Sequence, residues 1–121
     1  MKQIYTDSNG VTATASSNKP AGHFYDIVAG EHKVTLQFQN GGVEDNGVNG
    51  ITNEALLAVL EDRLTHLNDK FPCIQNNLAI INIKAALTIL EQRTASREAR
   101  GVEQRRIAAA SREEFQSDGD I

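Results

Sequence analysis

The chain has 121 residues, of which 40% are apolar, so it can form one domain with a modest core. Its formal net charge is −4, which disfavours a nucleic-acid polymer as a partner. No segment approaches the roughly 18 apolar residues of a membrane-spanning helix, and the N-terminus lacks the apolar run of a signal peptide. We therefore expect a single domain over residues 1–121, away from membranes and in the cytoplasm.

The first part of the chain, residues 1–50, has the composition of a small antiparallel sheet with a glycine-rich loop. Three segments are rich in β-branched and aromatic residues: Val11–Ala15, His23–Val28 and Val34–Phe38. Turn-forming Asn, Gly, Ser and Pro residues separate them, which predicts short strands joined by tight connections. Apolar residues at 34, 36 and 38 alternate with polar ones, so we expect one face of the last strand to be buried.

A loop rich in glycine and asparagine follows at residues 40–50 and leads into a helix. Gly and Asn adopt positive φ at little cost and allow close backbone approach, although this composition also fits a plain connector. Thr52 is a good N-cap and Glu54 suits a first helical turn, so the helix should begin at Thr52. Its apolar stripe is expected at four positions: Leu56, Leu60, Leu64 and Leu67. We expect residues 68–70 and Pro72 to break the helix.

A second helix should begin near Cys73, because no Pro or Gly follows before Gly101, and it should run towards Phe115. Two apolar seams follow it at helical spacing. They consist of Ile80, Ile83, Leu87 and Leu90, and of Leu78, Ile81, Ala85 and Ile89. The shorter helix cannot cover both seams, so we expect the chain to dimerise through its helices. The predicted fold class is α+β: a small N-terminal antiparallel sheet, then a two-helix hairpin over 51–116 with a long second helix, and a polar tail at 117–121.

Arginine is concentrated in the second helix. Six of the seven arginines lie between Arg93 and Arg112. Arg93, Arg97 and Arg100 repeat at helical spacing and should continue the seam that begins at Ile80. A row of guanidinium groups is well suited to phosphate oxygens. The alternative is a solvated face with local ion pairs, and the residues alone leave both open.

Histidine and cysteine give weaker signals. His23, His32 and His66 are far apart and have no metal-ligand spacing, so we expect no metal site. Cys73 is the single cysteine, which excludes a disulfide within the chain and suits a reducing compartment. Its residue type favours a small, buried, apolar role.

Evidence for catalysis is weak. Glu44 and Asp45 could form a carboxylate pair for acid–base chemistry, but adjacent acids in a glycine-rich loop are usually solvated. The chain has no phosphate-binding glycine motif, no zinc-protease motif and no nucleophile elbow. We therefore expect neither an enzyme nor a bound cofactor.

Two long motifs resemble one known family. The segment Phe38 to Leu64 reads FQNGGVEDNGVNGITNEALLAVLEDRL, close to the phage and prophage pattern FQNGPxxExGVNGxTxEALLxxxxDRL. The segment Phe71 to Glu103 resembles the continuation of that pattern, including its RTxxRxARGVE end. Together they cover about half of the chain. The sequence therefore resembles the helical-hairpin domain of the Thoeris anti-defence sponge family.

This resemblance implies a binding protein of phage origin. Members sequester cyclic ADP-ribose isomers made by bacterial TIR-domain enzymes, without cleaving them. Some relatives also bind cyclic di- or trinucleotides of CBASS immunity at a second site, and the family forms homodimers that assemble further, commonly to hexamers. The expected place of action is the cytoplasm of the infected bacterial host.

The resemblance also names ligand-binding residues. These are Asn76, Arg93, Arg97, Leu67, Phe38, Asn40 and Gly41. It implies that Asn76 hydrogen-bonds the ligand, that Arg93 and Arg97 hold the phosphates, and that the remaining residues line the pocket. Gln104 and Arg105 stand where the pattern has Gly-Thr, which weakens the case for the second site.

Helix length adds a geometric expectation. Asn76 and Arg93 should lie about 25 Å apart on one helix, at about 1.5 Å per residue. A cyclic ADP-ribose is far smaller, so one chain cannot place both on one ligand. Two antiparallel copies could do so, which predicts two symmetry-related pockets per dimer. The competing hypotheses are a nucleotide-signal hydrolase with Glu44 or Asp45 as base, and a structural or regulatory helical oligomer without a ligand.

Overall fold

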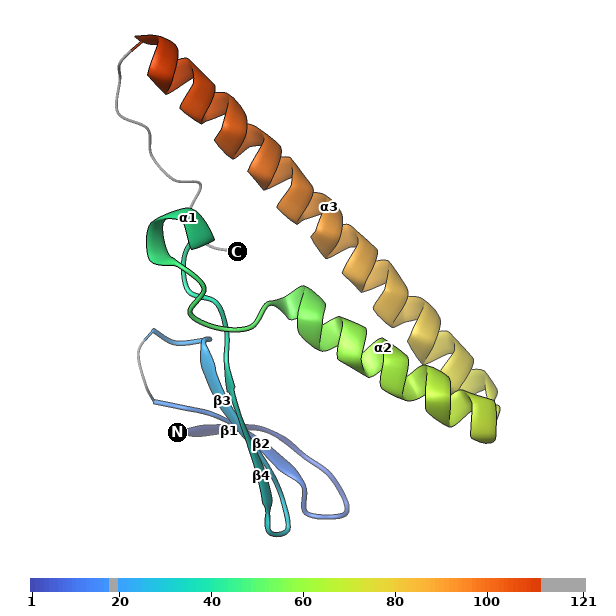
Figure 1. The fold of residues 1–121 in the computed structure, drawn as a ribbon. Coiled ribbons are helices and arrows are strands. Elements are labelled where there is room, and N and C mark those ends of the chain that lie inside the picture. Colours follow the sequence, from blue (N-terminus) through green and yellow to red (C-terminus); the bar gives the residue numbers. More distant parts are fainter. Residues whose placement is uncertain (18–19, 112–121) are drawn as a thin grey trace. The chain divides into compact units, whose positions relative to one another are not determined.

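The computed structural model describes residues 1–17 and 20–111, and the side chains of this range as far as Gly101. The chain forms two compact units, and the boundary between them in the sequence lies between Ile51 and Thr52 (Figure 1). The first unit is a sheet with a loop, and the second is a helical hairpin. The predicted α+β class is confirmed. The single-domain boundaries stay a prediction, and the tail at 117–121 lies outside the described residues.

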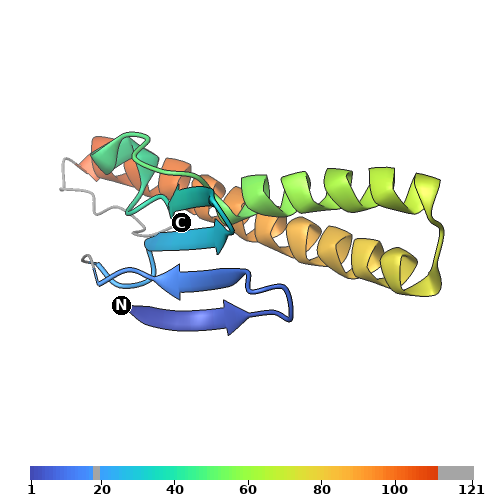
Figure 2. The ribbon, with the colours of Figure 1, turned by 90° about the horizontal axis from the view of Figure 1, so that it is seen from below.

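The sheet is an antiparallel meander of four strands in chain order, with the strands side by side in Figure 2. They are β1 (Lys2–Thr6), β2 (Thr12–Ala15), β3 (Phe24–Ala29) and β4 (His32–Gln37). The three predicted strands are confirmed to within two residues at each end. The first strand was missed, because its alternation is short and interrupted by a bulge between Gln3 and Tyr5.

One face of the sheet is apolar but only partly covered. The register pairs Tyr25 with Leu36 and Ile27 with Val34, which places these four side chains on one face. Tyr25 meets the Phe38 ring edge-on, with ring centroids 5.7 Å apart. Leu36 and Phe38 are half-buried, but Val34 remains 53% exposed, so the predicted burial is wrong there. The alternation predicted the apolar face correctly, but the part of that face at Val34 is covered only in part.

The glycine-rich loop contains a short helix, α1 (Val43–Asn46), where an irregular loop was expected. A parallel bridge between Phe38 and Ile51 joins the two ends of the loop. Two backbone hydrogen bonds form this bridge: Gln39 N donates to Ile51 O, and Ile51 N donates to Gln37 O, each at 2.8 Å. Residues 38–51 are therefore a closed loop of the kind that carries its own packing.

The second unit is a hairpin of α2 (Asn53–Lys70) and α3 (Ile74–Ser111), which run side by side in both ribbon views (Figures 1 and 2). Thr52 caps α2 as predicted, since its hydroxyl accepts a 3.1 Å bond from Ala55 N. The helix continues through residues 68–70 instead of breaking there. It ends at Phe71, directly before Pro72, because Pro disfavours helical geometry in the residue that precedes it. The expected extension of α3 to Phe115 lies outside the described residues.

The facing surfaces of the hairpin confirm one predicted seam and correct another. Ile80, Ile83, Leu87 and Leu90 are all half-buried on the α3 side. On α2, Leu56, Leu64 and Leu67 are half-buried as expected, but Leu60 is 43% exposed. Leu57 and Glu61 take part in the facing surface instead, because the 57–61–64 spacing follows the helical period towards α3.

The second predicted seam has no partner within the described chain. Leu78, Ile81 and Ile89 are 54%, 60% and 62% exposed, and Ala85 is exposed as well. No hydrophobic side chain among those described is fully buried. The hairpin therefore presents a continuous apolar face to its surroundings, whereas dimerisation itself stays a prediction.

No helix in the described residues is both long enough and apolar enough to cross a membrane.

Candidate functional site

The closed end of the hairpin brings together two of the predicted ligand residues. Leu67 lies in the last turn of α2 and Asn76 in the first turn of α3, and both side chains are half-buried. Their neighbours are directly bonded, since Asn68 Nδ2 donates to Asn77 Oδ1 at 2.7 Å. The turn therefore holds Leu67 and Asn76 at one end of the unit.

Hydrogen bonds of Asn68 and Cys73 fix the start of α3. Cys73 N donates to Asn68 Oδ1 at 3.1 Å, and Asn76 N donates to the Cys73 sulfur at 3.3 Å. The thiol thus satisfies one of the unpaired N–H groups of the first helical turn. Cys73 is exposed, so the expectation of a small buried side chain is wrong, because the residue lies in the turn and not on the packed face of α3.

The arginines lie towards the other end of α2. Arg93 is exposed and Arg97 is half-buried, and between them Thr94 Oγ1 donates a 3.0 Å bond to Glu54 Oε2 in the first turn of α2. The row of three arginines does not continue the packed seam as predicted. Thr94 and Arg97 continue it, whereas Arg93 and Arg100 are exposed. The step from Leu87 to Leu90 is already three residues, so a second 3-residue step turns Arg93 away from α2, and a 4-residue step is needed to stay on the seam.

The structure therefore places the predicted hairpin residues in two groups. Leu67 and Asn76 occupy the closed end, and Arg93 and Arg97 lie where α3 passes the start of α2. Asn76, Arg93 and Arg97 all lie on the one unbroken helix α3. The arrangement does not bring Asn76 and Arg93 of one chain together.

The remaining predicted residues belong to the loop of the first unit. Phe38 is half-buried against Tyr25, Asn40 is exposed, and Gly41 has φ +79°. A side chain at Gly41 would be strained by this φ and would also meet the amide of Asn46. The backbone at Gly41 is therefore held close to another part of the loop.

Two residues of this loop were missed by sequence reasoning. Gln39 alternates with Phe38 and was expected on the polar face, yet its side chain is 5% exposed and fully hydrogen-bonded. Asn49 holds the backbone of Asn40 on both sides. Strand alternation cannot reveal Gln39, because the strand has already ended there.

The loop and the helical hairpin together match a known protein family. The family model described as Acb2/Tad1, hairpin domain, matches residues 31–95, which is more than half of the chain. The chain belongs to this family. The match begins beside β4, includes the loop and α2, and ends after Arg93, so the hairpin domain contains every predicted site residue except Arg97.

One relative is similar to more than half of the chain. "Thoeris anti-defense 1" from Bacillus phage SBSphiJ7 is 46% identical over 70 residues, which cover 57% of this chain and 49% of the relative. The matched part of the chain spans about half the length of this curated relative. The resemblance to the Thoeris anti-defence family is confirmed.

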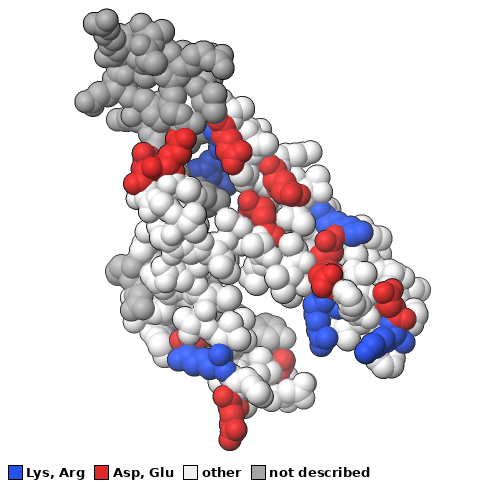
Figure 3. Space-filling view, in the orientation of Figure 1, with Lys and Arg blue, Asp and Glu red and all other residues white. Residues whose placement is uncertain are grey.

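Charge along the hairpin domain is mixed. In the view of Figure 3, acidic and basic side chains are interspersed over the helical hairpin and do not form one broad basic surface there. Glu44 and Asp45 are exposed in α1. Within the described residues, no group of three or more His, Cys, Asp or Glu is placed to hold a metal ion.

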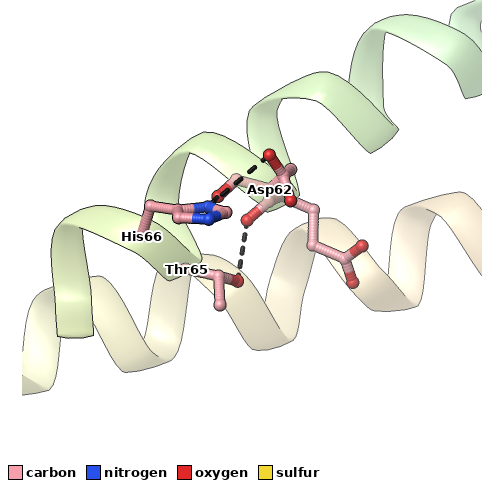
Figure 4. Close-up of polar contacts among 4 residues, drawn as sticks. Asp62, Thr65 and His66 are labelled. Atoms are coloured by element: carbon pink, nitrogen blue, oxygen red, sulfur yellow. Dashed lines mark hydrogen bonds and ion pairs between the residues drawn. The ribbon is translucent and has the colours of Figure 1, made fainter.

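The histidine of the hairpin makes a local contact. His66 Nδ1 lies 2.9 Å from Asp62 O and 3.5 Å from Asp62 Oδ2, beside the Thr65 hydroxyl that donates to Glu61 O (Figure 4). The bond to the Asp62 carbonyl and the charges of Asp62 and Asp69 raise the pKa of His66 above its ordinary value. These contacts are those of a satisfied surface histidine.

Proposed function

We propose that this protein is a phage anti-defence sponge that binds cyclic ADP-ribose isomers made by bacterial TIR-domain enzymes and does not cleave them. The observation that carries the proposal is the family match, because it runs through Asn76 and Arg93 in the hairpin that presents both. The name of the Bacillus phage relative supports an anti-defence role. The expected place of action is the cytoplasm of the infected host.

The proposed pocket is formed by two chains. Asn76 and Arg93 are 17 residues apart (93 − 76) on one unbroken helix, or about 25 Å at about 1.5 Å per residue. An antiparallel copy would place Asn76 of one chain beside Arg93 of the other. The exposed face of Leu78, Ile81 and Ile89 supplies apolar surface for such a contact. Two equivalent pockets per dimer follow from the symmetry, and dimers can assemble further, with a hexamer as the expected form.

Each side chain in this pocket has a chemical role. The guanidinium groups of Arg93 and Arg97 suit the two phosphates of the ligand, and the Asn76 amide can both donate to and accept from a base or ribose. Leu67 offers an apolar surface beside Asn76. From the family resemblance, Phe38, Asn40 and Gly41 of the first unit are also proposed to contact the ligand. Binding without cleavage requires no catalytic base in this pocket.

The biological effect would follow from mass action. A sponge lowers the free concentration of the signal below the level that activates the defence effector, provided that pockets are as abundant as signal molecules. Slow release matters more than fast capture, because the signal must stay bound while its synthesis continues. A second site for cyclic di- or trinucleotides belongs to the same proposal, with its ligand contacts at the assembly of dimers.

The test separates the sponge from a hydrolase. The full-length protein is incubated with each of a panel of cyclic ADP-ribose isomers and with cyclic di- and trinucleotides, then denatured, and the released nucleotide is identified by chromatography. Intact ligand recovered in stoichiometric amount supports the proposal. Cleaved product would show a hydrolase instead.

A matched pair of variants tests the ligand itself. Arg93→Ala should abolish the nucleotide-induced rise in melting temperature while the protein stays oligomeric. Arg63→Ala removes one exposed arginine of α2 and should leave that rise unchanged. Absence of any nucleotide-induced rise in the wild-type protein would favour a structural or regulatory helical oligomer.

A further inference from the structure

The Gln39 side chain is the anchor of the loop at residues 38–51. It is 5% exposed, and its three hydrogen bonds all go to the backbone of that loop. The Nε2 group donates to Gly47 O at 2.8 Å and to Gly41 O at 3.1 Å, and Oε1 accepts from Asn49 N at 2.9 Å. One amide therefore ties three separate points of the loop to the end of β4.

The Asn49 side chain completes this arrangement at Asn40. Its Oδ1 accepts from Asn40 N at 2.7 Å and its Nδ2 donates to Asn40 O at 2.8 Å. Asn49 is itself fixed, since Gln37 Nε2 donates to Asn49 O at 2.7 Å. Both backbone polar groups of Asn40 are thus engaged. The Asn40 side chain is exposed, and among the described residues its amide has no partner.

The loop is also closed sterically at Gly50. A Cβ on Gly50 would lie 2.5 Å from the Phe38 carbonyl carbon, 2.6 Å from Gln37 O and 2.7 Å from Gln39 N. All three are backbone atoms and cannot move aside cheaply. The two ends of the loop therefore lie in close backbone contact, and a side chain at residue 50 would force them apart.

From these contacts we propose that Gln39 and Asn49 are positioning residues that hold the backbone of Asn40 and so fix the place from which its side-chain amide reaches the bound nucleotide. This proposal rests on the proposed function, because Asn40 must contact the ligand. A loop backbone that already has its binding conformation before the ligand arrives loses little conformational entropy on binding. Gln39 and Asn49 act through Asn40 and do not touch the ligand themselves.

The first experiment measures association and dissociation rates of a cyclic ADP-ribose isomer by stopped-flow or surface methods. Gln39→Met keeps the length of the side chain and removes its three hydrogen bonds. It should weaken binding by about tenfold through a slower association rate, because only a fraction of molecules then holds the loop in its binding conformation. Asn40→Ala removes a contact instead and should mainly raise the dissociation rate. Gln3→Met, the same change in exposed β1, should alter neither rate.

The second experiment combines the variants. If Gln39 acts through Asn40, Gln39→Met should weaken binding little further once Asn40→Ala is present. Gln39→Glu should weaken binding at least as much as Gln39→Met, because its buried carboxylate would face the carbonyl oxygens of Gly41 and Gly47 and could not donate to them. Asn49→Ser should repeat the slow association with Gln39 left in place. It serves as the second variant if Gln39→Met disturbs the sheet, which amide hydrogen exchange of β3 and β4 would reveal.

The outcomes separate the two proposals. If the wild-type protein binds no cyclic ADP-ribose isomer, both proposals are wrong. If the wild-type protein binds but Gln39→Met and Asn49→Ser bind as tightly and as fast, only the positioning role is wrong. Losses that simply add in the Gln39→Met, Asn40→Ala double variant would likewise overturn the positioning role and leave the sponge intact.

Discussion

Thr94 and Glu54 join the two helices of the hairpin through a 3.0 Å hydrogen bond between their side chains, 40 residues apart in sequence. The bond is partly buried and links the first turn of α2 to α3 between Arg93 and Arg97. It fixes where along α3 the shorter helix begins. The position of the arginines relative to α2 therefore depends on a contact that is neither apolar nor an ion pair.

Removing this bond should loosen the hairpin. Thr94→Val and Glu54→Gln should each lower the free energy of unfolding by about 1 kcal/mol, since a hydrogen bond to a charged group is lost or weakened in a partly solvated place. Urea unfolding of each single variant and of the double variant measures the coupling between the two residues. Losses that add fully would mean that the bond contributes nothing by itself.

The exposed apolar face of α3 predicts the behaviour of assembly variants. Ile81→Glu puts a charge in the middle of the face formed by Leu78, Ile81, Ala85 and Ile89. If that face is the dimer interface, the variant should weaken association by about 2 kcal/mol or more, roughly thirtyfold in the dissociation constant. Sedimentation equilibrium measures the change in the dissociation constant.

Ala55→Glu is the control for this variant, because Ala55 is exposed in the first turn of α2, where the helix dipole favours an acid. An Ile81→Glu protein that assembles like the wild type would exclude this face as the interface.

The hairpin was largely predictable from the sequence because its signals are local. Thr52 as N-cap, Pro72 as break and the seam from Ile80 to Leu90 each depend on residues within a few turns of one another. The side chains that orient the site were not predictable. The Thr94–Glu54 bond spans 40 residues, so no local spacing indicates it.

The loop shows a different limit of sequence reasoning. Glycine and asparagine content correctly indicated positive φ and close backbone approach, as at Gly41 and Gly50. It could not show that Gln39 turns inward, because that direction depends on where β4 ends and on three backbone groups that converge on one amide. Val34 shows the opposite case. The strand alternation correctly placed it on the apolar face of the sheet, but its burial depends on which other residues pack against that face.

Two glycine variants should differ sharply in cost. Gly50→Ala places a methyl group against backbone atoms of Phe38 and Gln37, and it should destabilise the first unit by about 2–4 kcal/mol. Gly30→Ala has open space but φ +61°, so it should cost only the conformational strain of about 1 kcal/mol. Thermal or urea unfolding of both variants gives the difference. Equal costs would show that the loop relaxes around the new methyl group.

His66 predicts a small pH dependence of stability. The contacts with Asp62 raise the pKa of His66 in the folded protein. A raised folded-state pKa stabilises the protein below the unfolded-state pKa, and this stabilisation is lost as the pH rises through the folded-state value. His66→Gln should therefore lower the melting temperature more in mildly acidic buffer than in mildly basic buffer. The effect should be small, because the side chain is exposed. A difference between wild type and His66→Gln that is the same at both pH values would contradict the contact.

The two-chain pocket makes the sharpest prediction, because defects in different chains can complement each other. Asn76→Ala and Arg93→Ala proteins should each bind no ligand, since every pocket lacks one of the two residues. When the two proteins are unfolded together and refolded in equal amounts, half of the dimers should be mixed. Each mixed dimer then has one pocket with both defects and one pocket with none, so about one quarter of all pockets should recover. Titration calorimetry with a cyclic ADP-ribose isomer measures the recovered fraction. Refolding each variant alone is the control and should recover none. A mixture that also recovers none, from chains shown to exchange, would overturn the two-chain pocket, and α3 would then have to break between Asn76 and Arg93 when the ligand binds.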